Sequence, residues 1–332
     1  MRSEGIATMK AAYIDRVGPP ENIQFGELPA PAVGPSDVLI KTTAVCVDPV
    51  DALIRSGQLP EDLPFPFIVG RDMAGVVQAV GPAVRRFAPG DRVWCNNQGY
   101  HGRQGTFAEL VAVRDDLLYP LPPGVEDKEA VAFVHSGLTA CIGLQDAGLR
   151  SGELLFINGG AGNVGSAVLQ LARGRGARVI VTAGNDEGLA WCRELGAERA
   201  INYRTENVDQ ALAEVAPDGV NVYWDASGHP DFDQSVARVA RRGRIVVMCG
   251  YAARPPFPVG PFYVKRCSMH GFAITYATDA ELQACADEIN AWLAQGKLKV
   301  RIDRILPLSA AADAHRLVEG KTPLAGKIVL VP

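Results

Sequence analysis

A glycine-rich loop in the middle of the sequence is its clearest chemical signal. Gly160, Gly162 and Gly165 form an unbroken G-x-G-x-x-G pattern between the apolar run 154–157 and a segment with a helical apolar stripe. In such a strand–turn–helix setting the first glycine permits a tight turn. The second lets a pyrophosphate approach the backbone, and the third lets the helix pack closely on the strand. Because free N–H groups at the start of a helix also favour an anion, the pattern predicts a dinucleotide-binding site.

The end of the next strand bears on which dinucleotide is bound. An NAD site usually places Asp or Glu there, to bind the ribose 2′-hydroxyl. In this sequence the strand runs into Gly184 and Asn185, and the first acidic residue, Asp186, comes later than expected. The uncharged end leaves room for a 2′-phosphate, to which Tyr203 and Arg204 could add a phenol and a cation. The sequence therefore favours NADPH, with an ordinary surface arginine as the alternative interpretation of Arg204.

The elements around this loop indicate two kinds of architecture. Apolar runs separated by helical segments occur in the second half of the chain, at residues 154–157, 178–182, 221–225 and 244–248. Such runs predict an α/β Rossmann domain, a doubly wound parallel sheet covered by helices on both faces. The first 130 residues are instead rich in proline and contain short β-like runs, which predict an irregular β-barrel.

The last 60 residues are expected to return to the first domain. A helix with Leu282, Ile289 and Leu293 on one face precedes the apolar strand 327–331. We therefore expect one domain to comprise residues 1–131 and 270–332, and the Rossmann domain to comprise residues 132–269.

Composition excludes several classes of function. The chain has 332 residues and a net charge of −4, without a Lys/Arg-rich tract, which argues against a nucleic-acid partner. The sequence contains no apolar run of about 18 residues, so no membrane span is expected. Its first residues lack the apolar core of a signal peptide. The seven cysteines form no Cys-x-x-Cys pair, which is typical of a reduced, cytoplasmic protein without disulfides or a zinc knuckle.

Several motifs occur in an order that resembles a known family. They lie at residues 47–57, 70–77, 79–81, 90–93, 161–165, 182–184 and 326–330. With them the chain resembles the zinc-independent medium-chain dehydrogenases/reductases, specifically the quinone oxidoreductase and zeta-crystallin branch. The resemblance implies a GroES-like catalytic domain beside the Rossmann domain, and hydride transfer from NADPH to a quinone or an activated C=C bond of a small-molecule substrate.

The resemblance also assigns residues to the cofactor. The family's contacts correspond here to Asp48, Thr139, Gly162, Asn163, Val164, Gly165, Gly184, Tyr203, Gly250, Phe272, Ala273 and Ile274, with Lys321 where a basic residue often lies near the phosphates.

No metal is expected. In the zinc-dependent alcohol dehydrogenases the catalytic ligands stand at positions matching Asp48, Arg71 and His135, and an arginine in place of a ligand histidine is hard to reconcile with a bound cation. Asp48, Asp72 and His135 could still form an unusual O/O/N site, or could simply make hydrogen bonds around the cofactor ribose and helix starts. Asp48 and His135 are also the candidate proton donors, with solvent as the alternative.

The sequence departs from its own branch in ways that bear on the substrate. A quinone reductase usually has Asn at the position of Asp48, and often tyrosines at Leu53 and just after Gly57. A reductase of enones, enals or unsaturated thioesters is therefore an alternative, as is a non-catalytic, crystallin-like or RNA-associated NADPH-binding protein. The polar segment 96–105 could line the substrate mouth or be only a flexible loop.

A homodimer is expected from the resemblance. We expect the apolar run 244–249 to present a sheet edge that pairs across a two-fold axis, unless the proline-rich segment 255–258 simply covers that edge.

Overall fold

A computed structural model describes residues 7–320, 322 and 324–332. The chain divides into two compact units, one formed by Met1–His135 and Ala286–Pro332 and the other by Ser136–Cys285. Along the chain, the boundaries between the units fall within the long helices α2 (Asp127–Asp146) and α8 (Asp279–Ala294). In the part of the chain that is described, no helix combines the length and the apolar character needed to cross a bilayer.

The first unit is built mainly from antiparallel strands. Its strands are β1 (Thr8–Ile14), β2 (Gln24–Pro29), β3 (Asp37–Val47), β4 (Phe67–Ile68), β5 (Asp72–Val80), β6 (Arg92–Cys95), β7 (Leu110–Arg114), β8 (Tyr119–Pro120), β15 (Ile302–Pro307) and β16 (Lys327–Val331). Its other helices are α1 (Pro49–Ser56) and α9 (Ala311–Glu319), and it has three-residue 3-10 turns at Pro20–Asn22, Asp115–Leu117 and Leu308–Ala310. One sheet has the order β2-β1-β4, and the larger sheet has the order β15-β16-β3-β5-β6-β8, with β7 also paired to β3.

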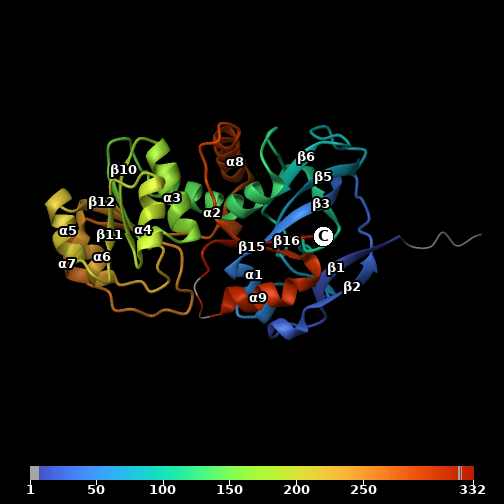
Figure 1. The fold of residues 1–332 in the computed structure, drawn as a ribbon, viewed down its shortest axis with the longest axis horizontal. Helices are drawn as coiled ribbons and strands as arrows, with labels where there is room; N and C mark the ends of the chain where they lie inside the picture. The colour runs from blue at the N-terminus through green and yellow to red at the C-terminus, as the bar shows by residue number, and fades with distance from the viewer. Residues whose placement is uncertain (1–6, 321, 323) are drawn as a thin grey trace, which may run out of the picture. The chain divides into compact units, whose positions relative to one another are not determined.

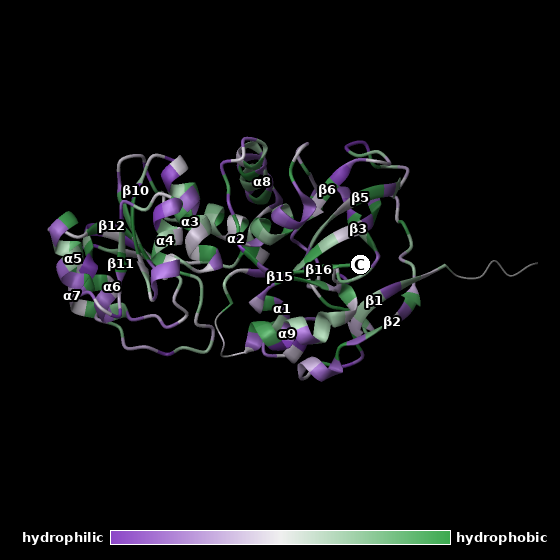
Figure 2. Ribbon diagram, in the orientation of Figure 1, coloured by the Kyte–Doolittle hydropathy of each residue, from purple (hydrophilic) through white to green (hydrophobic). Residues whose placement is uncertain are grey.

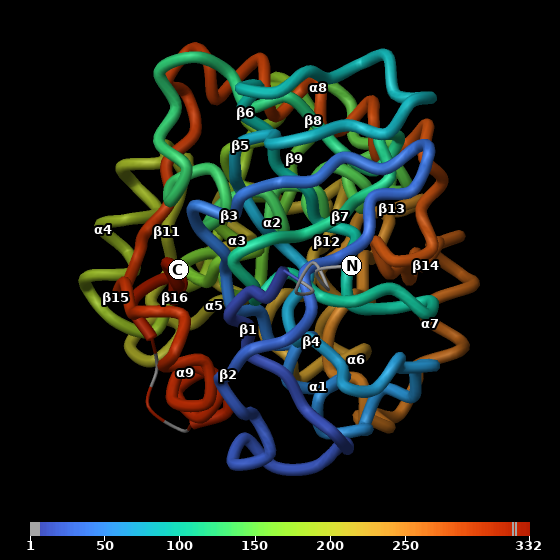
Figure 3. Tube along the Cα trace, turned by 90° about the vertical axis from the view of Figure 1, so that its right-hand side faces the viewer, coloured from blue at the N-terminus to red at the C-terminus, as the bar shows by residue number. Residues whose placement is uncertain are grey.

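The end of the chain completes this larger sheet. Strand β16 pairs in parallel with β15 and antiparallel with β3, where Ile328 lies opposite Val47. Figure 3 shows the red C-terminal strands beside the blue strand β3. The predicted helical face is also confirmed, because Leu282, Ile289 and Leu293 of α8 are all buried.

Helix α9 contributes an unusual polar residue to the core of the first unit. The side chain of His315 is fully buried, and neither ring nitrogen has a hydrogen-bond partner among the described residues. Its ring meets the ring of Phe107 edge-on, with the centroids 6.1 Å apart. Burial, helped by the nearby positive charge of Arg55, lowers the pKa of His315 to about 3. The histidine is therefore neutral in the folded protein at physiological pH.

The second unit is a six-stranded, fully parallel sheet. Its strands are β9 (Leu154–Asn158), β10 (Arg178–Ala183), β11 (Arg199–Asn202), β12 (Val220–Asp225), β13 (Val239–Val247) and β14 (Ser268–Gly271), in the order β11-β10-β9-β12-β13-β14. Its helices are α3 (Asn163–Gly174), α4 (Asp186–Glu194), α5 (Val208–Val215), α6 (Phe232–Arg238) and α7 (Val259–Val264), with a 3-10 turn at Ile274–Tyr276.

Helices cover this sheet on both faces, as predicted for a Rossmann domain. Phe156, Tyr223 and Ile245 point to one face and pack with Leu212 of α5 and Val236 of α6. Helices α3 and α4 lie on the opposite side of the sheet from α5, α6 and α7 (Figure 1). Figure 2 shows both hydrophobic and hydrophilic residues on these helices, as expected when one face packs on a sheet and the other faces water.

The edge of the parallel sheet differs from the expectation. The run 244–249 was expected to present the edge, but most of it belongs to β13, which is paired on one side with β12 and on the other with β14. The short strand β14 takes the edge position instead. The prediction missed β14 because its sequence, Ser268–Gly271, is polar and only four residues long.

Candidate active site

The glycine loop connects β9 to α3 with a specific task for each glycine. The left-handed turn residue is Gly159, with φ +92°, so the sequence interpretation, which gave the tight turn to Gly160, was off by one residue. A Cβ on Gly160 would lie 2.5 Å from the Cβ of Val181, and one on Gly165 would collide with the backbone of Gly159. A Cβ on Gly162 would meet only the Gly159 carbonyl oxygen, at 3.6 Å. Gly162 is thus free of internal packing, and the space beside it is open.

This open loop lies where parallel sheets usually bind ligands. From β9 the chain builds outward through β10 and β11, and then returns to place β12 on the other side of β9. Ligands bind at the carboxyl ends of strands at such a switch point. Gly162 and Asn163 are exposed there, at the start of a twelve-residue helix without a side-chain cap. The first turn of α3 therefore offers unsatisfied N–H groups and a positive dipole end to an anion.

A second group of residues lies at the carboxyl end of β10. The hydroxyl of Tyr203 lies against Gly184, so closely that any side chain at residue 184 would collide with the phenol. Tyr203 is 51% exposed, and the Arg204 guanidinium lies 5.9 Å from its ring centroid. The Asn185 side chain accepts a 2.8 Å hydrogen bond from the N–H of Gly188 and so caps α4. The structure brings these predicted residues together without a carboxylate at the strand end.

Most of the other predicted cofactor residues lie on α2 and after strands β13 and β14. Thr139 is buried in α2. Gly250 follows β13 with φ +79°, and the exposed Ala273 and buried Ile274 follow Phe272, whose ring lies 6.0 Å from that of Trp224. Lys321 lies outside the described residues.

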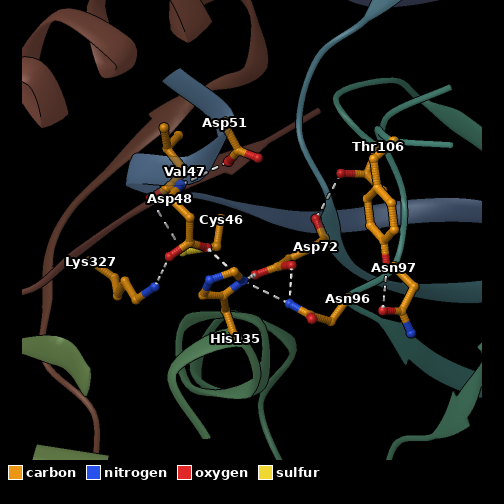
Figure 4. A network of polar contacts seen from close by, with 11 residues as sticks. Cys46, Val47, Asp48, Asp51, Asp72, Asn96, Asn97, Thr106, His135 and Lys327 are labelled. Atoms are coloured by element: carbon orange, nitrogen blue, oxygen red, sulfur yellow. Dashed lines mark hydrogen bonds and ion pairs between the residues drawn. The ribbon is translucent and has the colours of Figure 1, made fainter. Parts of the chain in front are cut away.

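A polar cluster in the first unit unites the two candidate catalytic residues (Figure 4). Asp48 caps α1, Asp72 begins β5, His135 lies on α2, and Lys327 begins β16. His135 Nδ1 lies 3.6 Å from Asp72 Oδ2 and 3.9 Å from Asp48 Oδ2. Lys327 Nζ contacts Asp48 Oδ1, and the Asn96 amide nitrogen contacts Asp72 Oδ1 and lies 2.9 Å from His135 Nδ1. These contacts join segments from both ends of the chain.

Burial and neighbouring charges set the protonation of this cluster. The side chains of Asp48, Asp72 and Lys327 are at most 2% exposed, whereas that of His135 is 14% exposed. Burial would raise the pKa of Asp48, but His135 and Lys327 outweigh it and lower that pKa below its ordinary value. Burial, reinforced by the charge of Asp48 and opposed by His135, raises the pKa of Asp72 to about 6. Although burial alone would lower the pKa of Lys327, the Asp48 carboxylate raises it. Asp48 and Lys327 therefore form a buried ion pair.

The first half of the polar segment 96–105 is buried, whereas His101, Gly102 and Gln104 in its second half are exposed. Asn96, Asn97 and Tyr100 are each at most 3% exposed. The Tyr100 ring lies between the guanidinium groups of Arg71 and Arg103, 4.6 and 4.5 Å from its centroid, and its hydroxyl donates a 3.1 Å hydrogen bond to Asn97. The polarity of its buried half therefore reflects internal hydrogen bonding and stacking.

Comparisons with known proteins agree with this architecture. Residues 34–123 match the alcohol dehydrogenase GroES-like domain, and residues 163–291 match the family described as zinc-binding dehydrogenase. The chain is 31% identical to the quinone oxidoreductase of Mus musculus, over 98% of this chain and 99% of that protein. It is 32% identical to the chloroplastic NADPH-dependent alkenal/one oxidoreductase of Arabidopsis thaliana, over 91% of this chain and 74% of that protein.

A solved structure extends the likeness to the fold. The Escherichia coli quinone oxidoreductase, solved as a complex with NADPH, is 25% identical and superposes with a TM-score of 0.85, covering 98% of this chain and all of that one. A GroES-like unit combined with a Rossmann-type parallel sheet is the architecture of dehydrogenases and reductases of the alcohol dehydrogenase type. The chain belongs to the medium-chain dehydrogenase/reductase family, in its quinone oxidoreductase branch.

The zinc that one family description implies can be tested against the residues present. One oxygen or nitrogen atom from each of Asp48, Asp72 and His135 lies within 4.8 Å of the others, which is close enough for a metal site. However, Lys327 already brings a positive charge onto Asp48, and Asn96 contacts both other groups. Arg71, at the remaining matching position, is buried and stacks on Tyr100. A second cation beside the Lys327 ammonium would be repelled, so these residues do not fit zinc.

Two members of the cluster escaped the sequence interpretation. Lys327 was noticed only as the first residue of an apolar strand, and Asn96 only as part of a supposed loop. A lysine that opens an otherwise apolar, buried strand is itself a signal, because a fully buried ammonium requires an anionic partner.

Proposed function

We propose that this chain is an NADPH-dependent oxidoreductase that reduces a quinone or the C=C bond of an α,β-unsaturated carbonyl compound without a metal ion. The observation that carries the proposal is the open first turn of α3, where Gly162 is exposed and a Cβ would meet no internal neighbour closer than 3.6 Å. A loop that served only to turn the chain would have no need for glycine at this position, because φ is −72° there.

Each part of the second unit then has a role toward the cofactor. Backbone N–H groups of Asn163, Val164 and Gly165 bind the pyrophosphate, and Gly160 lets the loop lie against β10. The 2′-phosphate is received beside Gly184, Asn185, Tyr203 and Arg204. The nicotinamide side is lined by Thr139, Gly250, Phe272, Ala273 and Ile274. When bound, NADPH supplies the hydride.

The polar cluster then supplies the proton that must follow a hydride. His135 is its most exposed titratable member, whereas Asp48 and Asp72 are sealed from solvent. We therefore assign proton delivery to His135, with Asn96 holding the ring at 2.9 Å and the nearby Asp48 and Asp72 contributing negative charge.

The choice between quinones and enones can be tested directly. The branch often has tyrosines at the position of Leu53 and just after Gly57, where this chain has Gln58 and Leu59. One relative is named as an oxidoreductase of alkenals and alkenones. NADPH oxidation by the purified protein should be measured with matched panels of quinones, enones, enals and unsaturated thioesters, with product analysis. Turnover of at least one class is expected. A protein that binds NADPH but reduces none of them would contradict the proposal and favour a non-catalytic NADPH-binding protein.

Cofactor preference follows from the uncharged end of β10. We expect NADPH to bind at least about tenfold more tightly than NADH, because no carboxylate repels the 2′-phosphate and Arg204 can pair with it. Arg204→Ala should weaken NADPH binding about tenfold and change NADH binding less than twofold. Fluorescence titration gives both constants. Arg199→Ala is the matched control, since Arg199 is an exposed arginine nearby that pairs with Glu206 at 2.8 Å. Equal affinities for the two cofactors in the unmodified protein would refute this assignment.

A homodimer is proposed through the open edge of β14. Helix α7, which directly precedes this strand, exposes three large apolar side chains, Val259, Tyr263 and Val264, each at least 62% exposed. A strand with one open edge, next to an exposed apolar helix, suits pairing with a second copy across a two-fold axis. Light scattering at micromolar concentration should give the mass of a dimer, and Val264→Asp should give a monomer. Val33→Asp, on an exposed apolar residue of the other unit, should leave the dimer intact. A monomeric unmodified protein would exclude the pairing.

We also place the protein in the cytoplasm, because none of the seven cysteines, all within the described residues, forms a disulfide.

A further inference from the structure

We propose that Lys327 is the resident cation of the Asp48–Asp72–His135 cluster, and that its ammonium group supplies the positive charge that a divalent metal ion would otherwise supply. Lys327 is thus a positioning residue, which acts through Asp48. The proposal goes beyond the reaction proposed above and does not depend on which substrate is reduced.

The first support is the geometry of the cluster. Two carboxylates and one imidazole from three different segments converge, with one ligand-type atom of each within 4.8 Å of the others. Oxygen and nitrogen donors at this spacing are the type of set that binds zinc or cobalt. The Lys327 ammonium contacts the Asp48 carboxylate at the border of this set (Figure 4).

The second support is the charge balance. Asp48 and Lys327 are each only 2% exposed, and Asp72 is not exposed at all. A buried carboxylate without a compensating charge is strongly unfavourable, so removal of the ammonium leaves Asp48 to acquire either a proton or another cation.

The third support is the state of the outer carboxylate oxygens. Asp48 Oδ2 and Asp72 Oδ2 are buried and have no hydrogen-bond partner among the described residues, although both lie within 4 Å of His135 Nδ1. Buried carboxylate oxygens are normally satisfied by donors. Here the two carboxyl groups face each other and one imidazole, which is the arrangement of a ligand set whose cation is supplied from one side by Lys327.

The consequence for the reaction is positional. Lys327 fixes one oxygen of Asp48, which directs the other oxygen toward His135. The zinc-independent chemistry of this chain then depends on a lysine from β16, and the cluster retains a latent ability to bind metal.

The test is to remove the ammonium and offer a metal. Lys327→Ala should bind about one Co²⁺ per chain at micromolar concentration and develop the visible absorption of a cobalt site with oxygen and nitrogen ligands. The unmodified protein and Lys327→Arg should bind less than about a tenth of an equivalent. Lys327→Ala/Asp48→Asn should lose at least tenfold in cobalt affinity relative to Lys327→Ala, because one ligand is gone. Equilibrium dialysis with elemental analysis gives the stoichiometry, and circular dichroism reports folding.

Each outcome decides the proposal. Cobalt uptake only after loss of Lys327, or a Lys327→Ala protein that folds only when cobalt is present, supports it. A folded Lys327→Ala that binds no cobalt overturns it, as does stoichiometric metal in the unmodified protein. A variant that stays unfolded with cobalt while Lys327→Arg folds also overturns it, because the lysine then serves folding alone. None of these readouts requires turnover, so they stand apart from the test of the reductase activity.

Discussion

Gly162→Val should abolish NADPH binding, with a loss of affinity of at least about a hundredfold, while the second unit stays folded. The backbone at Gly162 has φ −72°, which valine adopts without strain, and a Cβ there meets only one protein atom, at 3.6 Å. The added methyl groups therefore intrude mainly on the space of the pyrophosphate. Loss of binding would consequently report a clash with the ligand and not a damaged fold.

The neighbouring residues provide matched controls. Asn163→Ala should reduce affinity only slightly, because the contact expected there comes from the backbone N–H. Gly165→Ala should instead destabilise the unit, since its Cβ would collide with the carbonyl of Gly159. NADPH affinity by fluorescence titration and thermal unfolding by circular dichroism separate the three variants. If Gly162→Val binds NADPH normally, the dinucleotide is not bound at this loop.

His315→Leu should remove much of the acid sensitivity of the first unit. The folded pKa of His315 is about 3, against 6.5 for the free side chain. Because the unfolded chain takes up the proton more readily, the stabilisation is fully present above about pH 6.5 and is lost as the pH falls toward 3. The linkage amounts to about 2 kcal/mol between pH 7.5 and pH 5, and on the order of 5 kcal/mol by pH 3. Leucine has a similar size and carries no proton, so the variant should lack this component.

Urea unfolding at pH 7.5 and pH 5.0 measures the difference between the two proteins. The quantity to compare is the change in unfolding free energy between the two pH values in each protein, because other groups, including Asp72, titrate in the same range in both. His270→Leu is a suitable control, because His270 is a partly exposed histidine of the other unit. Identical losses of unfolding free energy in the unmodified protein and His315→Leu would show that the histidine is protonated without cost.

The parallel sheet was readable from local sequence because its strands are buried on both faces. A run such as Leu154–Asn158, between a turn and a glycine loop, leaves few alternatives to a buried strand, and it is one. The same logic fails for β14, which at the edge needs little apolar character. Local sequence also could not show that Gly159, and not Gly160, is the left-handed turn residue. Which of two adjacent glycines takes a positive φ depends on how the loop meets β10.

Only part of the candidate site could be predicted from the sequence, for a different reason. Asp48 and His135 were proposed from their resemblance to positions in related sequences, and the structure places them in one cluster. The partner of Asp48, however, is 279 residues away, and no periodicity or spacing connects Lys327 to it. The buried segment around Asn96 and Tyr100 was misjudged for the same reason. Polar side chains there satisfy one another inside the fold, and composition alone cannot distinguish that from exposure to water.

The position of β16 has a consequence for how the chain is made. The second unit is one continuous stretch and can fold as soon as residue 285 has left the ribosome. The sheet of the first unit must wait much longer, because the place between β3 and β15 is filled only by residues 327–331. Until translation reaches them, β3 has an open edge and Asp48 lacks its ammonium partner. The nascent protein can therefore hold a finished nucleotide unit while its other half remains exposed to strand mispairing and to chaperones.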